Sequence, residues 1–435
     1  MSPACIAARY LEQMPTLDVD SEQPLRAAMV GRLREIGAIR RDEVAKAFSR
    51  VPRHAFAPEA TLEEAYDPEA VVRTKWAADG TTTISSVSAP QIQARMIEQA
   101  GIASGMRVLE IGSGGFNAAL LAELVGREGH VVTLDIDADI TSRARRLLDE
   151  NGYTHVDVVL GDGDDGCATH APFDAIVVTV EAADIPPAWM AQLAEGGSLV
   201  APLRVRGFTR SIGFTKRGDR LVSTSKELAG FVKMQGQGRR PWTSVLLRGG
   251  TVRLRFDEER CPTGAATLER AFEAGQAQAW TGVTVRGDES LDTLQMWLAT
   301  SLNHSCVMSI DKDAEGVVEL LANPLIPSMC NAVVQGDSFA YLTKRDRGER
   351  KVEIGSHAFG PEASAAANLM ADLVRAWNHK HRRGPDPQYT ICPIGLVGPL
   401  PEGPVVMKRY VAIEVSWPLR ADDTSRAGRG QTGDW

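Results

Sequence analysis

A short run of glycines follows an apolar segment and precedes a second apolar segment with helical character. The run is Gly112-Ser113-Gly114-Gly115, between strand-like residues 107–111 and helix-like residues 117–124. Glycines allow a ligand to approach the backbone closely, and the free N–H groups at a helix start attract anionic groups. Glu110, two residues before the first glycine, could hold an ammonium group. The loop is therefore a candidate ligand site.

An acidic residue follows the next predicted strand, 130–134. Asp135 comes 23 positions after Gly112 and is followed by Ile136, so its carboxylate is placed to accept hydrogen bonds from ribose hydroxyls. Asp137 is the competing candidate. The alternative interpretation is that Asp137 or Asp139 caps the helix predicted over 140–150.

A third predicted strand, 156–160, is followed by Asp162 and Gly163. An acid there could bind an adenine amino group. The carboxyl ends of parallel strands meet at one edge of a sheet, where open α/β sheets bind ligands. Together the acids predict a nucleoside-binding edge.

A dinucleotide-binding loop is the competing interpretation of the glycine run. The G-x-G-x-x-G pattern, counted from Gly112, requires a glycine where this chain has Asn117. That pattern also lacks an acid in the position of Glu110. These two details separate the loop from that of dinucleotide-binding enzymes.

These residues, in this order, resemble the protein L-isoaspartyl O-methyltransferase family. The similarity extends over roughly residues 44–234 and is concentrated in Val51-Pro52-Arg53-His54-Ala55-Phe56, 84–90, 110–124, 161–163, 173–176 and 186–202. The glycine loop alone indicates a methyltransferase, whereas the Val-Pro-Arg segment and Ser88-Ala89-Pro90 are specific to the family. The resemblance implies a class I S-adenosylmethionine-dependent fold and methyl transfer to a carboxylate.

The resemblance also implies roles for individual residues. The predicted S-adenosylmethionine contacts are Glu110, Gly112, Ser113, Gly114, Asp135, Ile136, Asp162 and Gly163. Ser88 would stand between the methyl donor and the acceptor carboxylate.

The acceptor side departs from the family pattern. The usual Gly-Gln-Thr before Ser88 is replaced by a Thr- and Ser-rich run from 81 to 88, and Gln91 stands where several members have His. We predict Ser88 and Thr83 as catalytic residues and Ser86, Val87 and Ser88 as substrate-binding residues. The alternative for the run is a polar surface loop.

Methyl transfer from a sulfonium to a carboxylate needs little acid–base chemistry. A carboxylate with a pKa near about 4 is already ionised at neutral pH, so no general base is required. The protein must mainly align the reactants and exclude water. This agrees with a sequence that shows no His–Asp or Cys–His constellation.

The elements around these residues alternate between short apolar strands and helices. Strands are predicted at 107–111, 130–134, 156–160, 175–179 and 198–202, with helices at 94–97, 117–124, 140–150 and 189–194 and a hairpin at 211–223. This pattern is typical of a mostly parallel, Rossmann-like doubly wound sheet.

Five segments are predicted along the chain. They are a flexible leader (1–22), an N-terminal helical segment with an irregular lid over 66–88 (23–90), the cofactor-binding core (91–236), an α+β accessory domain (237–420) and a disordered tail (421–435). In the accessory domain, strands are predicted near 251–256, 305–310 and 405–417. Helices are predicted near 265–274, 289–301 and 362–378.

Composition limits the classes of function. The net charge of −8 gives no reason to expect nucleic acid, and no apolar run is long enough to cross a membrane. Six scattered cysteines without a CxxC pair predict no metal site and a reducing, cytoplasmic setting. A monomer is favoured.

The extension beyond the core resembles that of a longer branch of the family, which modifies ribosomally synthesised peptides such as lanthipeptides and lasso peptides. The main hypothesis is esterification of an aspartate in a constrained, macrocyclic peptide, with collapse to an aspartimide and then isoaspartate. Repair of isoaspartyl proteins is one alternative. A non-catalytic module that binds S-adenosylmethionine or peptide is the other.

Overall fold

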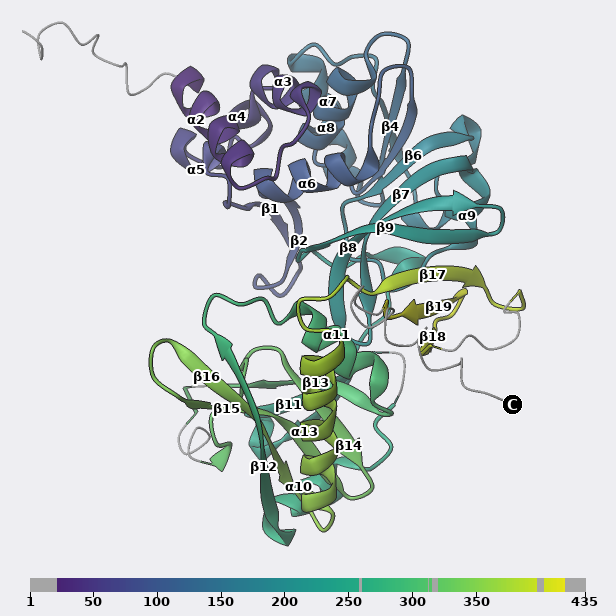
Figure 1. Cartoon of the computed structure of the whole chain (residues 1–435). Coiled ribbons are helices and arrows are strands. Elements are labelled where there is room, and N and C mark those ends of the chain that lie inside the picture. Colours follow the sequence, from purple (N-terminus) through teal and green to yellow (C-terminus); the bar gives the residue numbers. More distant parts are fainter. Residues whose placement is uncertain (1–21, 258–259, 312, 315–319, 397–402, 419–435) are drawn as a thin grey trace, which may run out of the picture. The chain divides into compact units, whose positions relative to one another are not determined.

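The computed structural model describes residues 22–257, 260–311, 313–314, 320–396 and 403–418 (Figure 1). The chain divides into two compact units, residues 1–161 with 175–177, and residues 162–174 with 178–435. Each unit is described by itself below. The predicted flexible leader, apart from Glu22, and the predicted tail lie outside the described residues.

The first unit begins with short helices, in agreement with the helical periodicity of its sequence. They are α2 (Glu22–Glu35), α3 (Asp42–Arg50), α4 (Arg53–Phe56), α5 (Leu62–Tyr66) and α6 (Pro90–Ala100). Helix α6 starts with Pro90 in its first turn, where no N–H partner is needed, and ends at Gly101 in the left-handed conformation.

The segment 66–88 is not irregular as predicted, because most of it forms an antiparallel hairpin. Strand β1 (Val72–Trp76) pairs with β2 (Thr83–Val87), with Val72 opposite Val87 and Trp76 opposite Thr83. The register shifts around Lys75, and four of the five β2 residues are only half-buried. The hydrophobic alternation that normally marks a strand is therefore missing from the sequence.

A parallel sheet forms the centre of the first unit. Strands β3 (Arg107–Ile111), β4 (His130–Asp135) and β5 (Asp157–Leu160) lie side by side, and β6 (Phe173–Val178) borders β3. Helix α7 (Phe116–Val125) connects β3 to β4, and α8 (Ala138–Glu150) connects β4 to β5. This confirms the predicted Rossmann-like arrangement.

In the second unit, a long antiparallel hairpin continues into strands from near the end of the chain. Helix α9 (Pro187–Gln192) precedes β7 (Leu193–Val205), β8 (Phe208–Arg217) and β9 (Arg220–Leu228). The sheet order is β18-β19-β17-β9-β8-β7, with β17 (Gln388–Pro393), β18 (Val405–Met407) and β19 (Val411–Ser416). The single strand predicted over 405–417 is thus two strands.

The second unit also contains a seven-stranded antiparallel sheet, of which the sequence had indicated only two strands. Its order is β10-β11-β13-β14-β15-β16-β12. These strands are β10 (Thr243–Leu247), β11 (Val252–Phe256), β12 (Gln276–Arg286), β13 (Ser305–Ile310), β14 (Cys330–Gln335), β15 (Ser338–Asp346) and β16 (Lys351–Phe359).

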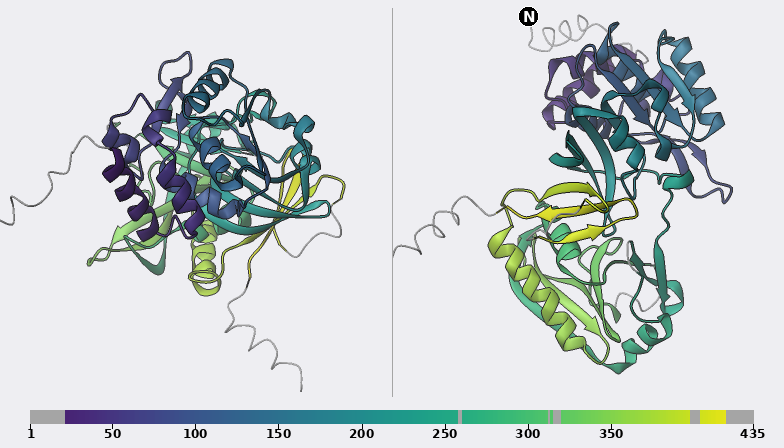
Figure 2. Two further views of the ribbon diagram at one scale, coloured as in Figure 1. Left: turned by 90° about the horizontal axis from the view of Figure 1, so that it is seen from above. Right: turned by 90° about the vertical axis from the view of Figure 1, so that its right-hand side faces the viewer.

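Three helices accompany this sheet at the predicted places, namely α10 (Ala265–Ala274), α11 (Asp292–Ser301) and α13 (Ala363–Lys380). Helix α13 lies along one face of the sheet and buries Met370, Val374 and Trp377 (Figures 1 and 2). Within the described part of the chain, no helix is long and apolar enough to span a bilayer.

Candidate active site

The glycine loop connects β3 to α7 in a conformation that its glycines make accessible. Gly112 has a φ of 99° and Gly115 a φ of 83°, values that residues with a side chain rarely adopt. A β-carbon at Gly115 would lie 3.1 Å from a ring carbon of Phe56 in α4. The loop therefore packs tightly against α4, and a side chain at Gly115 would disturb both.

Ser113 is the residue of the loop with an unsatisfied polar atom. Its backbone N–H donates to Asp135 Oδ2 at 3.0 Å, which ties the loop to the end of β4. Its Oγ is buried and has no hydrogen-bond partner among the described residues. Since buried hydroxyls nearly always have a partner, this Oγ fits a polar group of a ligand.

Asp135 and Ile136 offer complementary surfaces at the end of β4. The Asp135 carboxylate accepts from Ser113 N–H and from Asp137 N–H at 2.9 Å, and each oxygen keeps a further lone pair. Burial raises the pKa of Asp135, and the hydrogen bonds from these two N–H groups oppose this increase. The Ile136 side chain is 39% exposed. A ribose can bind the carboxylate while the apolar side chain covers the base.

Asp137 has a structural role at the start of α8. It caps α8 by accepting from the N–H groups of Asp139 and Ile140, at 2.9 and 3.3 Å. It also forms an ion pair with Lys75 of β1 at 2.6 Å, and Lys75 pairs with Asp139 at 2.7 Å. The helix-cap interpretation is therefore confirmed for Asp137.

Glu110 lies beneath the loop. Its side chain is fully buried, and its two oxygens accept from Asn117 Nδ2 at 2.8 Å and Thr133 Oγ1 at 2.6 Å. Burial raises the pKa of Glu110 to about 7. The carboxylate thus joins β3, α7 and β4. Asn117, noted in the sequence only because it replaces a glycine, donates to one oxygen of the Glu110 carboxylate.

Ser88 follows β2 directly and lies two residues before α6. It is half-buried, as is Ser86. A β-carbon at Gly114 would lie 3.8 Å from the carbonyl oxygen of Ser86, so the end of the hairpin reaches the glycine loop. Val87 as a whole residue is only 2% exposed, and its carbonyl oxygen accepts from Arg53, so it offers little surface to a substrate.

The structure does not bring the two predicted catalytic residues together. Thr83 begins β2 and Ser88 follows its end. An extended strand advances about 3.3 Å per residue, so the two residues are separated by about 16 Å. One carboxylate cannot contact both, and Ser88 is favoured because it follows the end of the hairpin that reaches the glycine loop at Ser86.

Arg53 was overlooked as a functional residue, although it stands in the Val-Pro-Arg segment. It is fully buried without an acidic partner and donates to Ala65 O at 2.7 Å, Gln93 Oε1 at 3.0 Å and Val87 O at 3.5 Å. Burial lowers the pKa of Arg53 to about 9, which leaves it charged at neutral pH. Arg53 therefore holds the backbone just before Ser88.

Asp162 and Gly163 belong to the second unit. Asp162 caps the short helix Gly163–Asp165 by accepting from Asp164 N–H at 3.0 Å, and its Oδ2 accepts from Gln237 N–H at 2.8 Å. Gly163 O accepts from Trp189 Nε1 at 2.7 Å. Their predicted cofactor contacts stay predictions.

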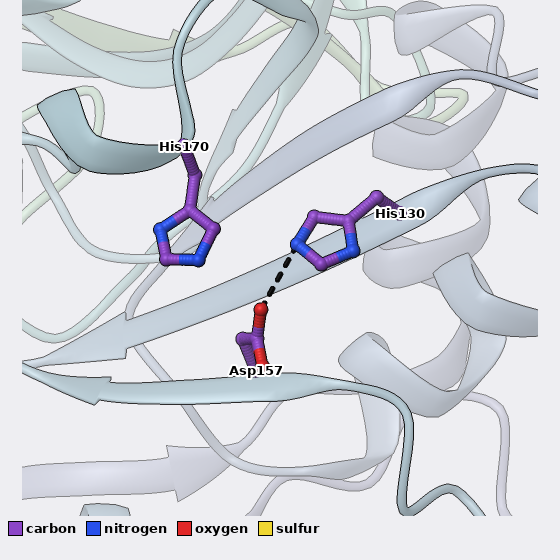
Figure 3. Close-up of side chains that lie close together, drawn as sticks. All are labelled: His130, Asp157 and His170. Carbon is purple, nitrogen blue, oxygen red and sulfur yellow. Dashed lines mark ion pairs between the residues drawn. The ribbon is translucent and has the colours of Figure 1, made fainter.

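His130 and Asp157 form an ion pair at 3.0 Å (Figure 3). These residues begin β4 and β5, so the pair lies at the amino ends of the strands. The glycine loop and Asp135 lie at the carboxyl ends. The pair therefore links two strands away from the candidate site.

Comparisons with known proteins converge on one family. The family model for protein-L-isoaspartate(D-aspartate) O-methyltransferase matches residues 24–238. The protein-L-isoaspartate O-methyltransferase of Methanothermobacter thermautotrophicus is 36% identical over 50% of this chain and 97% of its own length. That of Ignicoccus hospitalis is 42% identical over 38% of this chain and 76% of its own.

Solved structures are similar at lower identity. A protein-L-isoaspartate O-methyltransferase is 20% identical with a TM-score of 0.48, over 91% of this chain and 100% of its own. A β-aspartate methyltransferase from Plasmodium falciparum in complex with S-adenosyl-L-homocysteine is 18% identical with a TM-score of 0.41, over 48% of this chain and 97% of its own.

Proposed function

The chain belongs to the protein-L-isoaspartate O-methyltransferase family, and we propose that it methylates the side-chain carboxylate of isoaspartyl residues in peptides and proteins. Its fold is that of class I S-adenosylmethionine-dependent methyltransferases, and the family is one of carboxyl methyltransferases. The observation that supports the proposal best is the cradle formed by Ser113, Asp135 and Ile136, with the end of the β1–β2 hairpin reaching the glycine loop.

The residues of the first unit fit S-adenosylmethionine. Asp135 would accept hydrogen bonds from the ribose hydroxyls, and Ile136 would cover the adenine. The buried Ser113 Oγ would gain the partner that it lacks among the described residues. S-adenosylmethionine, when bound, supplies a methyl group on a positively charged sulfur. Glu110 would act through Asn117 and Thr133, as a positioning residue.

The chemical task of the protein is alignment. The acceptor carboxylate is already ionised at neutral pH, so no base is needed. Ser88 would donate a hydrogen bond that orients this carboxylate, and Arg53 would fix the backbone that presents Ser88. Half-burial of the Ser86–Ser88 segment would limit the access of water.

A dedicated aspartate-containing, constrained peptide is the second candidate substrate. The match to the family model ends at residue 238, whereas the chain continues through a seven-stranded sheet. The run 81–88 also departs from the family pattern. On this alternative, the neighbouring backbone nitrogen attacks the ester carbonyl and methanol leaves with the amide proton, and the resulting aspartimide then hydrolyses to isoaspartate.

Mass spectrometry with S-adenosylmethionine separates the two candidates. A linear isoaspartyl peptide and a macrocyclic aspartyl peptide are incubated with the full chain. A methyl-ester gain on the linear peptide supports the first proposal. A gain on the macrocycle alone, followed by net loss of water, supports the second, and no gain on either would contradict both.

Variants connect the activity to the site. Ser88→Ala should lower kcat by about tenfold or more, because an orienting donor is lost, without weakening binding of S-adenosyl-L-homocysteine. Ser85→Ala is the matched control, since its hydroxyl accepts from Thr74 Oγ1 at 2.9 Å within the hairpin. Equal rates for the two variants would remove Ser88 from the mechanism.

A further inference from the structure

The second unit contains a cavity of about 250 Å³. Most of its lining residues come from the segment that runs from β9 into β10, and the others lie between residues 181 and 204. Its lining is rich in cations, namely Arg204, Lys233, Arg239 and Arg240. Glu181 and Trp242 also line it. We call it the basic pocket. None of the residues predicted for the cofactor or acceptor lines it.

The acids near the basic pocket are already engaged. Arg204 is buried and forms ion pairs with Glu181 at 3.0 Å and Asp257 at 2.7 Å. Glu181 also accepts from Thr209 Oγ1 at 2.7 Å. By contrast, Lys233, Arg239 and Arg240 form no ion pair within the described part of the chain. Arg240 interacts with the Asp164 carboxylate through space but not as an ion pair, and the lining of the pocket has more cations than acids.

Two buried donors of the pocket have no acceptor among the described residues, namely Arg240 Nη2 and Trp242 Nε1. Arg240 Nη1 donates to the carbonyl oxygens of Gln237 and Arg239, at 2.7 and 2.8 Å, which fixes the guanidinium group. Buried donors without a partner cost free energy. An anionic oxygen could satisfy either of them.

Cations also surround the Trp242 ring. The Arg204 and Arg255 guanidinium carbons lie 4.7 and 5.0 Å from the ring centre, and Lys233 Nζ lies 5.7 Å from it. Burial lowers the pKa of Lys233, and the nearby guanidinium groups of Arg204, Arg255 and Arg239 lower it further, against an opposing effect of Glu181. An anion bound here would relieve this repulsion.

We propose that the basic pocket binds a carboxylate side chain of the peptide substrate, at a position other than the methylated residue. This rests on the proposed function, because the peptide is taken as the substrate. The cavity volume suits one side chain rather than a nucleic-acid strand. The net charge of −8 also opposes a polyanion. Acidic peptides are thus the preferred substrates.

The test uses fluorescence anisotropy with two isoaspartyl peptides that bear an uncharged dye. One has flanking aspartates, and the other has asparagines in their place. The wild-type full chain should bind the acidic peptide more tightly. Arg240→Gln, and the double variant Lys233→Gln with Arg239→Gln, should weaken that binding about tenfold, because charge-assisted hydrogen bonds are lost. Binding of the neutral peptide should not change.

Arg217→Gln is the matched control, since this exposed arginine at the end of β8 lies outside the pocket. Unchanged melting temperatures and affinities for S-adenosyl-L-homocysteine would show that the variants fold. Equal wild-type affinity for both peptides, or variants that match Arg217→Gln, would overturn the proposal. Tighter binding of an RNA oligomer than of the acidic peptide would also overturn it.

Methyl transfer to both peptides is followed in parallel, which keeps the two proposals apart. If the acidic preference depends on the basic pocket but no methyl group is transferred, the pocket assignment stands and the proposed function fails. If methyl transfer occurs and the pocket variants behave like the wild type, the proposed function stands and the pocket assignment fails.

Discussion

Replacing Glu110 by Gln should change how the stability of the first unit depends on pH. Burial raises the pKa of Glu110 from 4.5 to about 7. Between pH 4.5 and about 7, Glu110 therefore stays protonated in the folded chain, whereas it has lost this proton in the unfolded chain. This stabilisation is complete below pH 4.5 and is lost as pH rises through about 7. The shift corresponds to about 3 kcal/mol.

Glu110→Gln removes this titration but keeps groups that can bond to Asn117 and Thr133. As pH rises from 4.5 to 8, the opening free energy of the wild type should fall by about 3 kcal/mol because Glu110 loses its proton, and that of the variant should not show this fall. Hydrogen–deuterium exchange of peptides from β3 and β4 measures this energy in the full chain, after correction for the intrinsic exchange rate at each pH.

Glu128→Gln is the control, because this exposed residue lies in the same unit, between α7 and β4 and outside the glycine loop. Its pH dependence should follow that of the wild type. If the Glu110→Gln curve also runs parallel to the wild type across pH 4.5–8, Glu110 does not titrate in this range. The account of a buried carboxylate that holds a proton would then be wrong.

Four further variants test the site. Asp135→Asn should weaken calorimetric binding of S-adenosyl-L-homocysteine about tenfold or more, and Asp137→Asn much less; equal losses would contradict the assignment of the ribose to Asp135. Arg53→Met should lower the free energy of unfolding by about 3 kcal/mol in denaturant titrations, since the carbonyl of Val87 and other buried acceptors lose their donor; an unchanged midpoint would refute this. Lys75→Gln should speed amide exchange in the β1–β2 hairpin, because its link to Asp137 is lost; unchanged protection would show that the ion pair does not hold the hairpin.

The core was predictable because its signals are local. The strands at 107–111 and 130–134 are short apolar runs, and the helices at 117–124 and 140–150 have their own periodicity. The hairpin over 72–87 escaped prediction, because its half-buried residues and the register shift near Lys75 remove any alternation. Strands β14, β15 and β16 escaped as well, although they pair as consecutive hairpins, because long runs of buried residues leave them without alternation.

The sequence by itself determined the family, the glycine loop and the acid at the end of each strand, since these depend on residue type and spacing along the chain. The tertiary structure decided the burial and the partners of each acid. Asp137 caps a helix and binds Lys75, Glu110 is buried beneath the loop, and Asp135 stays half-exposed. Residues distant in sequence create these environments, as they do for Arg53 and the basic pocket. Burial and partners therefore become visible only when the chain is folded.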